Sequence, residues 1–256
     1  MNVALINNSS TASNLLKSGY RLARNLKKDF GIIAFVENKV EKKNQIENIE
    51  KYLSLNDFED VQVLVRQNSV SNLAVECEIL EASLLMIQWD DSMNKQLKKY
   101  LKYCRDLRIP YLFFKNDFSE MNFQKVLVTV GFLIEDYEKT QFASAFGRFC
   151  NSQILVLQAN DYGSKAGRTV NKMIQIFNKF NLNYSVEKAK SDSFKLDKEA
   201  IQKADSNGFD VVLISASRDY GLDDIIFGPK EYHLVKKSRV PLLIINPRGD
   251  LYTLCD

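Results

Sequence analysis

One loop of the sequence carries several residues that are suited to holding a phosphate group. They lie between a short apolar segment and an amphipathic one, and they are Ser215, Ser217, Arg218, Gly221 and Gly228. Glycine lets the backbone approach an anion closely, arginine pairs with phosphate or carboxylate, and a helix that starts behind the loop offers free N–H groups. Two simpler interpretations stay open. Arg218 could form a surface salt bridge, and Gly228 could mark the start of a helix, with Pro229 in the favoured first position.

Other reactive residue types lack the partners that chemistry would require. His233 is the only histidine, and nothing in the sequence places a nucleophile beside it for a Ser-His-Asp arrangement. Asp223 and Asp224 are adjacent without further spaced metal ligands, which favours a solvated loop. Arg248 is a second candidate for contact with an anion. No CxxC spacing for metal or redox chemistry occurs among the cysteines, which are Cys77, Cys104, Cys150 and Cys255.

The composition is that of an ordinary globular protein. Hydrophobic residues make up 45% and charged residues 26% of the 256 residues, and the net charge of +3 gives no electrostatic case for nucleic acid. The N-terminus lacks the basic and long apolar regions of a signal peptide, and no segment has the roughly 20 apolar residues that cross a bilayer. These features predict a cytoplasmic protein with reduced thiols and without membrane or nucleic-acid partners.

Apolar and amphipathic segments alternate through the first half. The predicted strands are residues 3–6, 32–36, 61–65, 84–87 and 111–114, and the predicted helices are residues 11–28, 44–55, 70–80 and 93–107. Ser9 or Ser10 is expected to cap the first helix, because a hydroxyl accepts the free N–H groups of a first turn.

The same order returns after a short polar linker. The predicted strands are residues 126–130, 154–157, 184–187, 211–215 and 242–245, and the predicted helices are residues 135–149, 165–180, 196–204 and 228–237. Strands that alternate with helices imply βαβ units and a parallel sheet. Matching segments support a duplication: residues 108–114 and 239–245 each contain a basic residue, a proline that stops a helix, and an apolar strand. The predicted domains are residues 1–116 and 123–247.

The chain resembles the universal stress protein family in the last third of each half. The most specific part is the segment from Ser215 to Pro241, with a turn after strand four, an apolar trio before Gly228, and a basic residue and proline before strand five. The resemblance implies an α/β fold of two tandem doubly wound five-stranded parallel sheets, order 3-2-1-4-5, similar to the adenine nucleotide alpha hydrolases. It also implies a pseudo-dimer packed through the fifth strands. Ligands in such sheets bind between strands one and four.

The second half departs from the pattern of the ATP-binding members of this family. Their motif G-x2-G-x9-G-[ST] reads here as Ser215-x2-Arg218-x9-Gly228-Pro229, so only the third glycine matches. Pro229 has neither the hydroxyl nor the N–H that would bind phosphate. These members also carry an acidic residue just past strand one, where this chain has residues 130–132, Val-Gly-Phe.

The first half departs further. Past strand one it has Asn7 and Asn8, which could bind a ribose or cap a helix. Its loop after strand four, residues 88–92, has no glycine, and Asp90 and Asp91 suit a helix start but would repel phosphate. A nucleotide site is therefore expected, if anywhere, in the second half.

Two functions remain open. The resemblance combined with the missing glycines favours a non-catalytic stress-response or regulatory protein that acts through protein contacts or a small ligand, with no certain cofactor and with a homodimer possible. The alternative is an ATP- or AMP-binding protein or weak hydrolase that uses the second-half crevice, around Ser215, Ser217, Arg218, Gly221 and Gly228.

Overall fold

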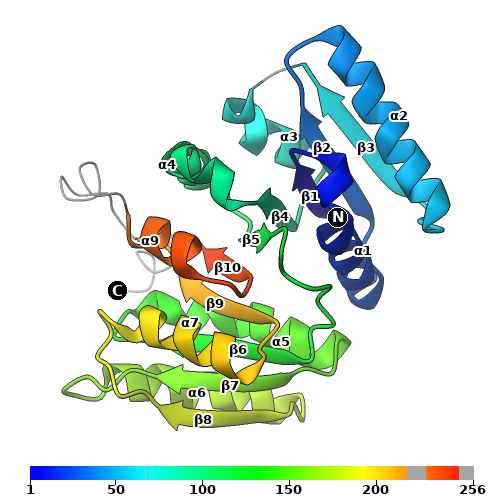
Figure 1. Cartoon of the computed structure of the whole chain (residues 1–256). Coiled ribbons are helices and arrows are strands. Elements are labelled where there is room, and N and C mark those ends of the chain that lie inside the picture. Colours follow the sequence, from blue (N-terminus) through cyan, green and yellow to red (C-terminus); the bar gives the residue numbers. More distant parts are fainter. Residues whose placement is uncertain (68, 218–228, 248–256) are drawn as a thin grey trace. The chain divides into compact units, whose positions relative to one another are not determined.

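The computed structural model describes residues 1–67, 69–217 and 229–247, and the chain divides into two compact units. Unit 1 comprises residues 1–121 and unit 2 comprises residues 122–256 (Figure 1). The predicted alternation of strands and helices is present in both units.

Unit 1 contains five strands and four α-helices among its described residues. The strands are β1 (Asn2–Ile6), β2 (Phe30–Phe35), β3 (Val61–Arg66), β4 (Leu84–Trp89) and β5 (Tyr111–Lys115). The α-helices are α1 (Ser13–Leu26), α2 (Lys39–Leu55), α3 (Leu73–Ile79) and α4 (Leu97–Cys104), and three 3-10 turns lie at Ser9–Thr11, Val70–Asn72 and Asp91–Lys95.

The sheet of unit 1 has the predicted order, β3-β2-β1-β4-β5, and its strands are parallel. β1 and β4 are completely buried because helices cover both faces of the sheet. α1 and α2 lie side by side, joined by a 3.0 Å hydrogen bond between the hydroxyls of Ser13 and Tyr52, and α3 packs beside α4.

Unit 2 repeats this plan. Its strands are β6 (Lys125–Val130), β7 (Gln153–Gln158), β8 (Tyr184–Lys188), β9 (Val211–Ser215) and β10 (Leu242–Ile245). Its α-helices among the described residues are α5 (Lys139–Phe149), α6 (Lys165–Lys179), α7 (Leu196–Asn207) and α9 (Lys230–Lys237), and a 3-10 turn at Ile134–Glu138 precedes α5.

The sheet of unit 2 has the order β8-β7-β6-β9-β10, which is again 3-2-1-4-5 when counted within the unit. α5 packs beside α6, and α7 packs beside α9, so that two helices cover each face within the part of unit 2 that the structure describes. The duplication and the doubly wound fold class predicted from the sequence are confirmed.

Two details of the helix starts differ from the prediction. Neither Ser9 nor Ser10 caps α1, whose N-cap is Ala12 without a side-chain hydrogen bond. Asn8, which was also expected as a possible cap, caps the preceding 3-10 turn by accepting the N–H of Ser10 at 2.9 Å. Pro229 directly precedes α9 and is not its first helical residue. In both places the chain enters the helix through an extended residue, which is the usual conformation of a cap.

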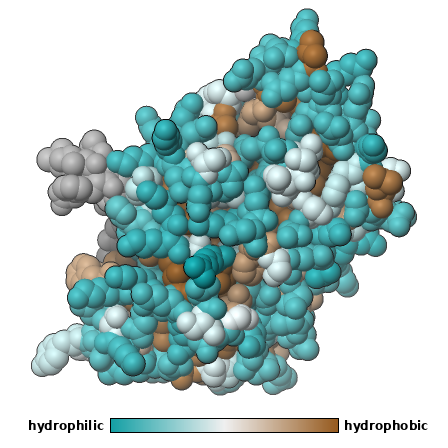
Figure 2. Space-filling view, in the orientation of Figure 1, coloured by the Kyte–Doolittle hydropathy of each residue, from teal (hydrophilic) through white to brown (hydrophobic). Residues whose placement is uncertain are grey.

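The visible surface is mostly hydrophilic, with small apolar spots (Figure 2). Within the described residues, no helix is both long and apolar enough to span a membrane.

Candidate functional site

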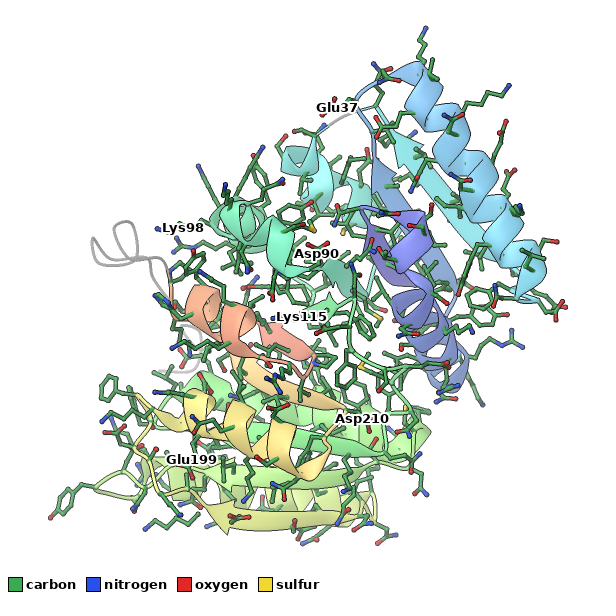
Figure 3. The ribbon with its side chains drawn as sticks, in the orientation of Figure 1. Glu37, Asp90, Lys98, Lys115, Glu199 and Asp210 are labelled. Atoms are coloured by element: carbon green, nitrogen blue, oxygen red, sulfur yellow. The ribbon has the colours of Figure 1, made fainter. Side chains whose placement is uncertain are left out.

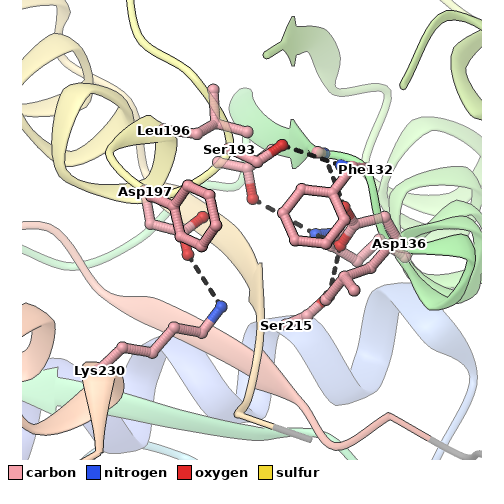
Figure 4. A pocket seen from close by; sticks show the side chains of 12 residues that line it. Phe132, Asp136, Ser193, Leu196, Asp197, Ser215 and Lys230 are labelled. Atoms are coloured by element: carbon pink, nitrogen blue, oxygen red, sulfur yellow. Dashed lines mark hydrogen bonds and ion pairs between the residues drawn. The ribbon is translucent and has the colours of Figure 1, made fainter. Parts of the chain in front are cut away.

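A cavity of about 230 Å³ opens at the carboxyl ends of β6 and β9 in unit 2. β6 pairs with β7 on one side and with β9 on the other, so the order of the sheet reverses here. In open α/β sheets this reversal leaves a crevice where ligands bind. The cavity lies between the loop after β6, the loop before α7, and the beginning of α9 (Figure 4).

Four buried polar side chains form the floor of the cavity. The Lys139 ammonium contacts the Asp136 carboxylate at 2.7 Å and the Thr129 hydroxyl at 3.3 Å. The Ser215 hydroxyl donates to the same carboxylate oxygen of Asp136 at 2.8 Å, and the N–H of Gly131 donates to its other oxygen at 2.6 Å. Lys139 is only 1% exposed, so the ammonium depends on these partners for its stability.

The environment of Asp136 keeps its carboxyl group ionised. Burial alone would raise its pKa, but the charge and hydrogen bond of Lys139, with the donors Ser215 and Gly131, hold the pKa below its ordinary value of 3.8. The floor of the cavity therefore contains a matched ion pair at neutral pH.

A second ion pair lies nearer the solvent. The Lys230 ammonium, at the start of α9, is 3.2 Å from the Asp197 carboxylate of α7 (Figure 4). Burial opposes the charged form of Lys230, but Asp197 and then Glu231 raise its pKa above the ordinary value. The side chain of Lys230 is 41% exposed, so this pair borders the opening of the cavity.

The loops around the cavity are joined through Ser193. Its hydroxyl accepts the N–H of Phe132 at 2.9 Å and donates to Asp161, which also accepts the N–H of Ser193 at 2.8 Å. Glu199 on α7 fixes the same loop by accepting the N–H groups of Lys190 and Ser191 (Figure 3). Three loops at the carboxyl edge of the sheet thus hold one another in place.

This arrangement explains why residue 131 is glycine. A Cβ atom at Gly131 would lie 2.6 Å from the Ser193 hydroxyl oxygen and 3.3 Å from an Asp136 carboxylate oxygen. We expect Gly131→Ala to lower the free energy of unfolding by roughly 1–3 kcal/mol, the usual effect of overpacking. Urea unfolding measures this change.

Two further variants test that explanation. Gly131→Ala should cost less in a Ser193→Gly background than in the natural chain, because the crowding atoms are removed; Ser193→Gly alone measures the loss of the hydroxyl's hydrogen bonds with Phe132 and Asp161. Gly167→Ala is the control: its Cβ would meet only the Gln158 amide nitrogen at 3.6 Å, and it lies within α6, so it should be neutral or stabilising by up to about 1 kcal/mol. If Gly131→Ala costs the same free energy of unfolding in the Ser193→Gly background as in the natural chain, the crowding is not the cause of the loss.

The loop after β9 is bound by a carboxylate of the protein itself. Ser217 donates its N–H and its hydroxyl to Glu231, the latter at 3.2 Å, and Glu231 is 1% exposed. Burial raises the pKa of Glu231, although the hydrogen bonds from Ser217 oppose this. The donors of Ser217 are therefore already occupied by the carboxyl group of Glu231 at the beginning of α9.

Several solved structures share this architecture across nearly the whole chain. A universal stress protein from Archaeoglobus fulgidus DSM 4304 is 12% identical, with a TM-score of 0.66, and the match covers 96% of this chain and 99% of that one. The chain has the universal stress protein fold.

Two other structures with this fold extend the comparison. A functionally unknown protein from Pseudomonas aeruginosa PAO1 matches 99% of this chain and 95% of its own, at 12% identity and a TM-score of 0.68. The cytoplasmic domain of a prokaryotic cation chloride cotransporter matches 95% of this chain and 94% of its own, at 11% identity and a TM-score of 0.57. No protein-family model and no curated protein matches the sequence.

The universal stress protein fold brings two of the predicted site residues to the crevice region. Ser215 lines the cavity, and Ser217 contacts Glu231. The other three predicted residues, Arg218, Gly221 and Gly228, lie outside the described residues, as do Asp223, Asp224 and Arg248.

The corresponding crevice in the fold of unit 1 is occupied by Gln88. Its side-chain oxygen accepts the N–H groups of Asn7 and Asn8 at 2.7 and 2.9 Å. Its amide nitrogen donates to the carbonyl of Asn8 and to the side chains of Thr11 and Asn116 at 2.8 to 3.0 Å. The amide of Asn7 contacts the backbone of Gln88, and Tyr100 donates to the Asn7 oxygen at 3.0 Å.

No sequence motif marks Asp136, Lys139 or Lys230 as part of a site. The family pattern has an acidic residue directly past strand one, where this chain has Gly131. The structure places the carboxylate of Asp136 against the N–H of Gly131, five residues away along the chain. The available signal was the i, i+3 spacing of Asp136 and Lys139, which puts both side chains on one side of a helical turn.

Proposed function

We propose that this protein is a non-catalytic, stress-response or regulatory protein whose second-half crevice binds a small ligand. The observation that supports this proposal is a cavity whose charged side chains are paired with each other, Asp136 with Lys139 and Asp197 with Lys230. Such pairs shape and stabilise a binding site, whereas acid–base catalysis needs a group that can exchange protons with the substrate.

The hydroxyl group in the cavity is poorly placed for nucleophilic catalysis. The Ser215 hydroxyl donates a hydrogen bond to Asp136. Lys139 lowers the pKa of Asp136, although the burial of Asp136 opposes this. A carboxylate with a lowered pKa is a weak base and would not activate a serine. We therefore assign Ser215 a structural role in the floor of the cavity.

The alternative, binding of ATP or AMP, is favoured by the fold but disfavoured by Glu231. A phosphate at the beginning of α9 would lie near the buried carboxyl group of Glu231, which already accepts both donors of Ser217. Pro229, which directly precedes α9, contributes no N–H to an anion. ATP, which carries more negative charge than AMP, should be affected more strongly.

Calorimetric titration with ATP and with AMP, with and without magnesium, tests this proposal together with an assay for phosphate release. We expect no hydrolysis and weaker binding of ATP than of AMP. Glu231→Gln removes the repulsion at nearly constant shape and should strengthen ATP binding roughly five- to tenfold. Glu187→Gln, on the outer strand β8, is the matched control. Tight, magnesium-dependent ATP binding or steady phosphate release would refute the non-catalytic proposal.

Three further expectations stand as predictions beside this proposal. They are the packing of the two halves through their fifth strands, a homodimer of the whole chain, and a cytoplasmic location. Each follows from the family resemblance or the composition and is independent of the ligand experiment.

A further inference from the structure

A groove of about 480 Å³ lies between α5 and α6 of unit 2. The two helices pack beside each other against the sheet of that unit (Figure 1). The volume is within the usual range of about 300–1,000 Å³ for sites that hold small organic molecules. Among the described residues, none lines both this groove and the crevice at the carboxyl ends of β6 and β9, so a ligand here is independent of the proposed function.

The two helices give the groove one polar and one apolar wall. Gln141, Ser144 and Arg148 of α5 follow one another at steps of three and four residues, so their side chains lie along one face of the helix. α6 contributes Ile176 and, directly after its last residue, Phe180. A molecule with one polar and one apolar side therefore matches this groove.

The guanidinium of Arg148 lies over two phenylalanine rings at one end of the groove. Its central carbon is 4.4 Å from the ring centroid of Phe180 and 5.1 Å from that of Phe149. Within the described part of the chain, no carboxylate pairs with Arg148. Contact with a ring face leaves the in-plane N–H donors of a guanidinium for other partners, and two parallel donors match the two oxygens of a carboxylate.

A second donor lies one helical turn before Arg148. Ser144 is only 6% exposed and lines the groove, and its hydroxyl has no hydrogen-bond partner among the described residues. Most buried polar atoms in proteins have a partner, because an unsatisfied one costs free energy. Rotation about χ1 moves the hydroxyl between staggered positions, so it can turn to donate to an oxygen atom of a ligand.

The other charged residue among the described lining is Glu138, which is 8% exposed. It precedes Arg148 by ten residues, which corresponds to about 15 Å along a helix. A ligand carboxylate bound at Arg148 therefore lies far from this like charge. The apolar part of the ligand then lies against α6.

We propose that the groove between α5 and α6 binds a small organic carboxylate whose apolar body consists of one or two rings. Arg148 and Ser144 hold the carboxylate, and the rings cover Phe149, Ile176 and Phe180. Phe149 and Phe180 are 41% and 40% exposed, so covering them removes apolar surface from water and favours binding. The charge of Arg148 selects an anion over a neutral compound of the same shape.

The test compares 2-naphthoate with 2-naphthamide, which share one ring system and nearly one shape but differ in charge. Each is titrated into the full-length chain while backbone amide signals are followed by NMR. We expect 2-naphthoate to shift signals of α5 and α6 with a Kd of about 1 mM or lower, as is usual for a ligand of this size. The amide should bind about 5- to 30-fold more weakly, because it lacks the charge.

Substitutions at the two donors separate recognition from structure. Arg148→Gln should weaken binding of 2-naphthoate about 5- to 30-fold and leave binding of the amide nearly unchanged. The matched control is Arg168→Gln, because Arg168 is an exposed arginine near the start of α6 that is bound to Ser164. Ser144→Ala should weaken binding of 2-naphthoate about 2- to 10-fold and raise the Tm of the free protein, since it removes an unpartnered buried hydroxyl.

Three results would overturn the proposal. Equal affinities for 2-naphthoate and 2-naphthamide would show that the groove does not recognise the carboxylate. Equal weakening by Arg148→Gln and Arg168→Gln would show that Arg148 has no specific role. If 2-naphthoate at up to about 5 mM leaves the signals of α5 and α6 unmoved, the groove is not a site for such ligands.

Discussion

Replacing Lys139 with methionine is expected to lower the free energy of unfolding of unit 2 by roughly 3–5 kcal/mol, because it leaves the buried Asp136 carboxylate without its counter-charge. Methionine keeps most of the aliphatic volume of the lysine, so the loss reports the charge and not a void. Urea unfolding followed by circular dichroism measures the change.

Two controls isolate the contribution of burial. Lys203→Met breaks an ion pair with Glu187 in the same unit, but these side chains are 26% and 50% exposed, so the expected change is below about 1 kcal/mol. Lys139→Met combined with Asp136→Leu removes both charges and should recover part of the loss. The recovery stays incomplete because Gly131 and Ser215 lose their acceptor. Similar losses for Lys139→Met and Lys203→Met would show that the buried pair has no special role.

The same pair predicts how stability depends on pH. The folded pKa of Asp136 lies below its unfolded value of 3.8, so its contribution is fully present above the unfolded pKa and is lost as pH falls through the folded pKa. In Lys139→Met the main cause of the lowered pKa is gone, while burial still raises it. Protonation of Asp136 should therefore favour the folded state of this variant, so that its loss of stability relative to the natural chain is largest at neutral pH and shrinks as pH falls, as urea unfolding at a series of pH values would show.

Local patterns in the sequence were sufficient to predict the succession of strands and helices. Each buried strand is a short apolar run, and each covering helix carries apolar residues at helical spacing, so periodicity alone separates them. Pro110 and Pro241 mark the same point in the two halves, just before β5 and β10. The duplication could be predicted because five strands and their helices recur in one order. The order of the strands within each sheet was implied by the family resemblance.

The helix caps could be predicted less well, because several adjacent residues can perform the same role. Asn8, Ser9 and Ser10 are all good caps by residue type. The structure uses Asn8, whose own N–H is held by Gln88 from a strand 80 residues away. That long-range contact fixes the backbone at Asn8, and no local pattern contains it.

The candidate site depends on such long-range contacts even more strongly. Asp136 receives donors from its own turn, from Gly131 and from Ser215, which is 79 residues away. The sequence motif for ATP binding consists of residues at fixed spacing in the loop after β9, and it does not include Asp136. Lys139 was equally hard to identify, since a lysine in an amphipathic helix normally faces solvent, and only the packing reveals that it is buried.

Replacing Gln88 with leucine is expected to lower the free energy of unfolding of unit 1 by roughly 2–3 kcal/mol. The change leaves the N–H groups of Asn7 and Asn8 without their acceptor, and each partly buried donor costs about 1–3 kcal/mol when it is unsatisfied. The neighbouring Trp89, the only tryptophan, is fully buried between Tyr100 and Phe113, so its fluorescence reports unfolding of this unit.

Gln62→Leu is the matched control, because Gln62 is an exposed strand residue of the same sheet and should change stability by less than about 0.5 kcal/mol. Gln88→Glu separates the two roles of the side chain. The carboxylate still accepts both N–H groups but cannot donate to Thr11 or Asn116 until it is protonated. Its stability should therefore rise as pH falls through the folded pKa of the new carboxyl group. Equal effects of the leucine substitution at positions 62 and 88 would show that Gln88 does not hold the first crevice closed.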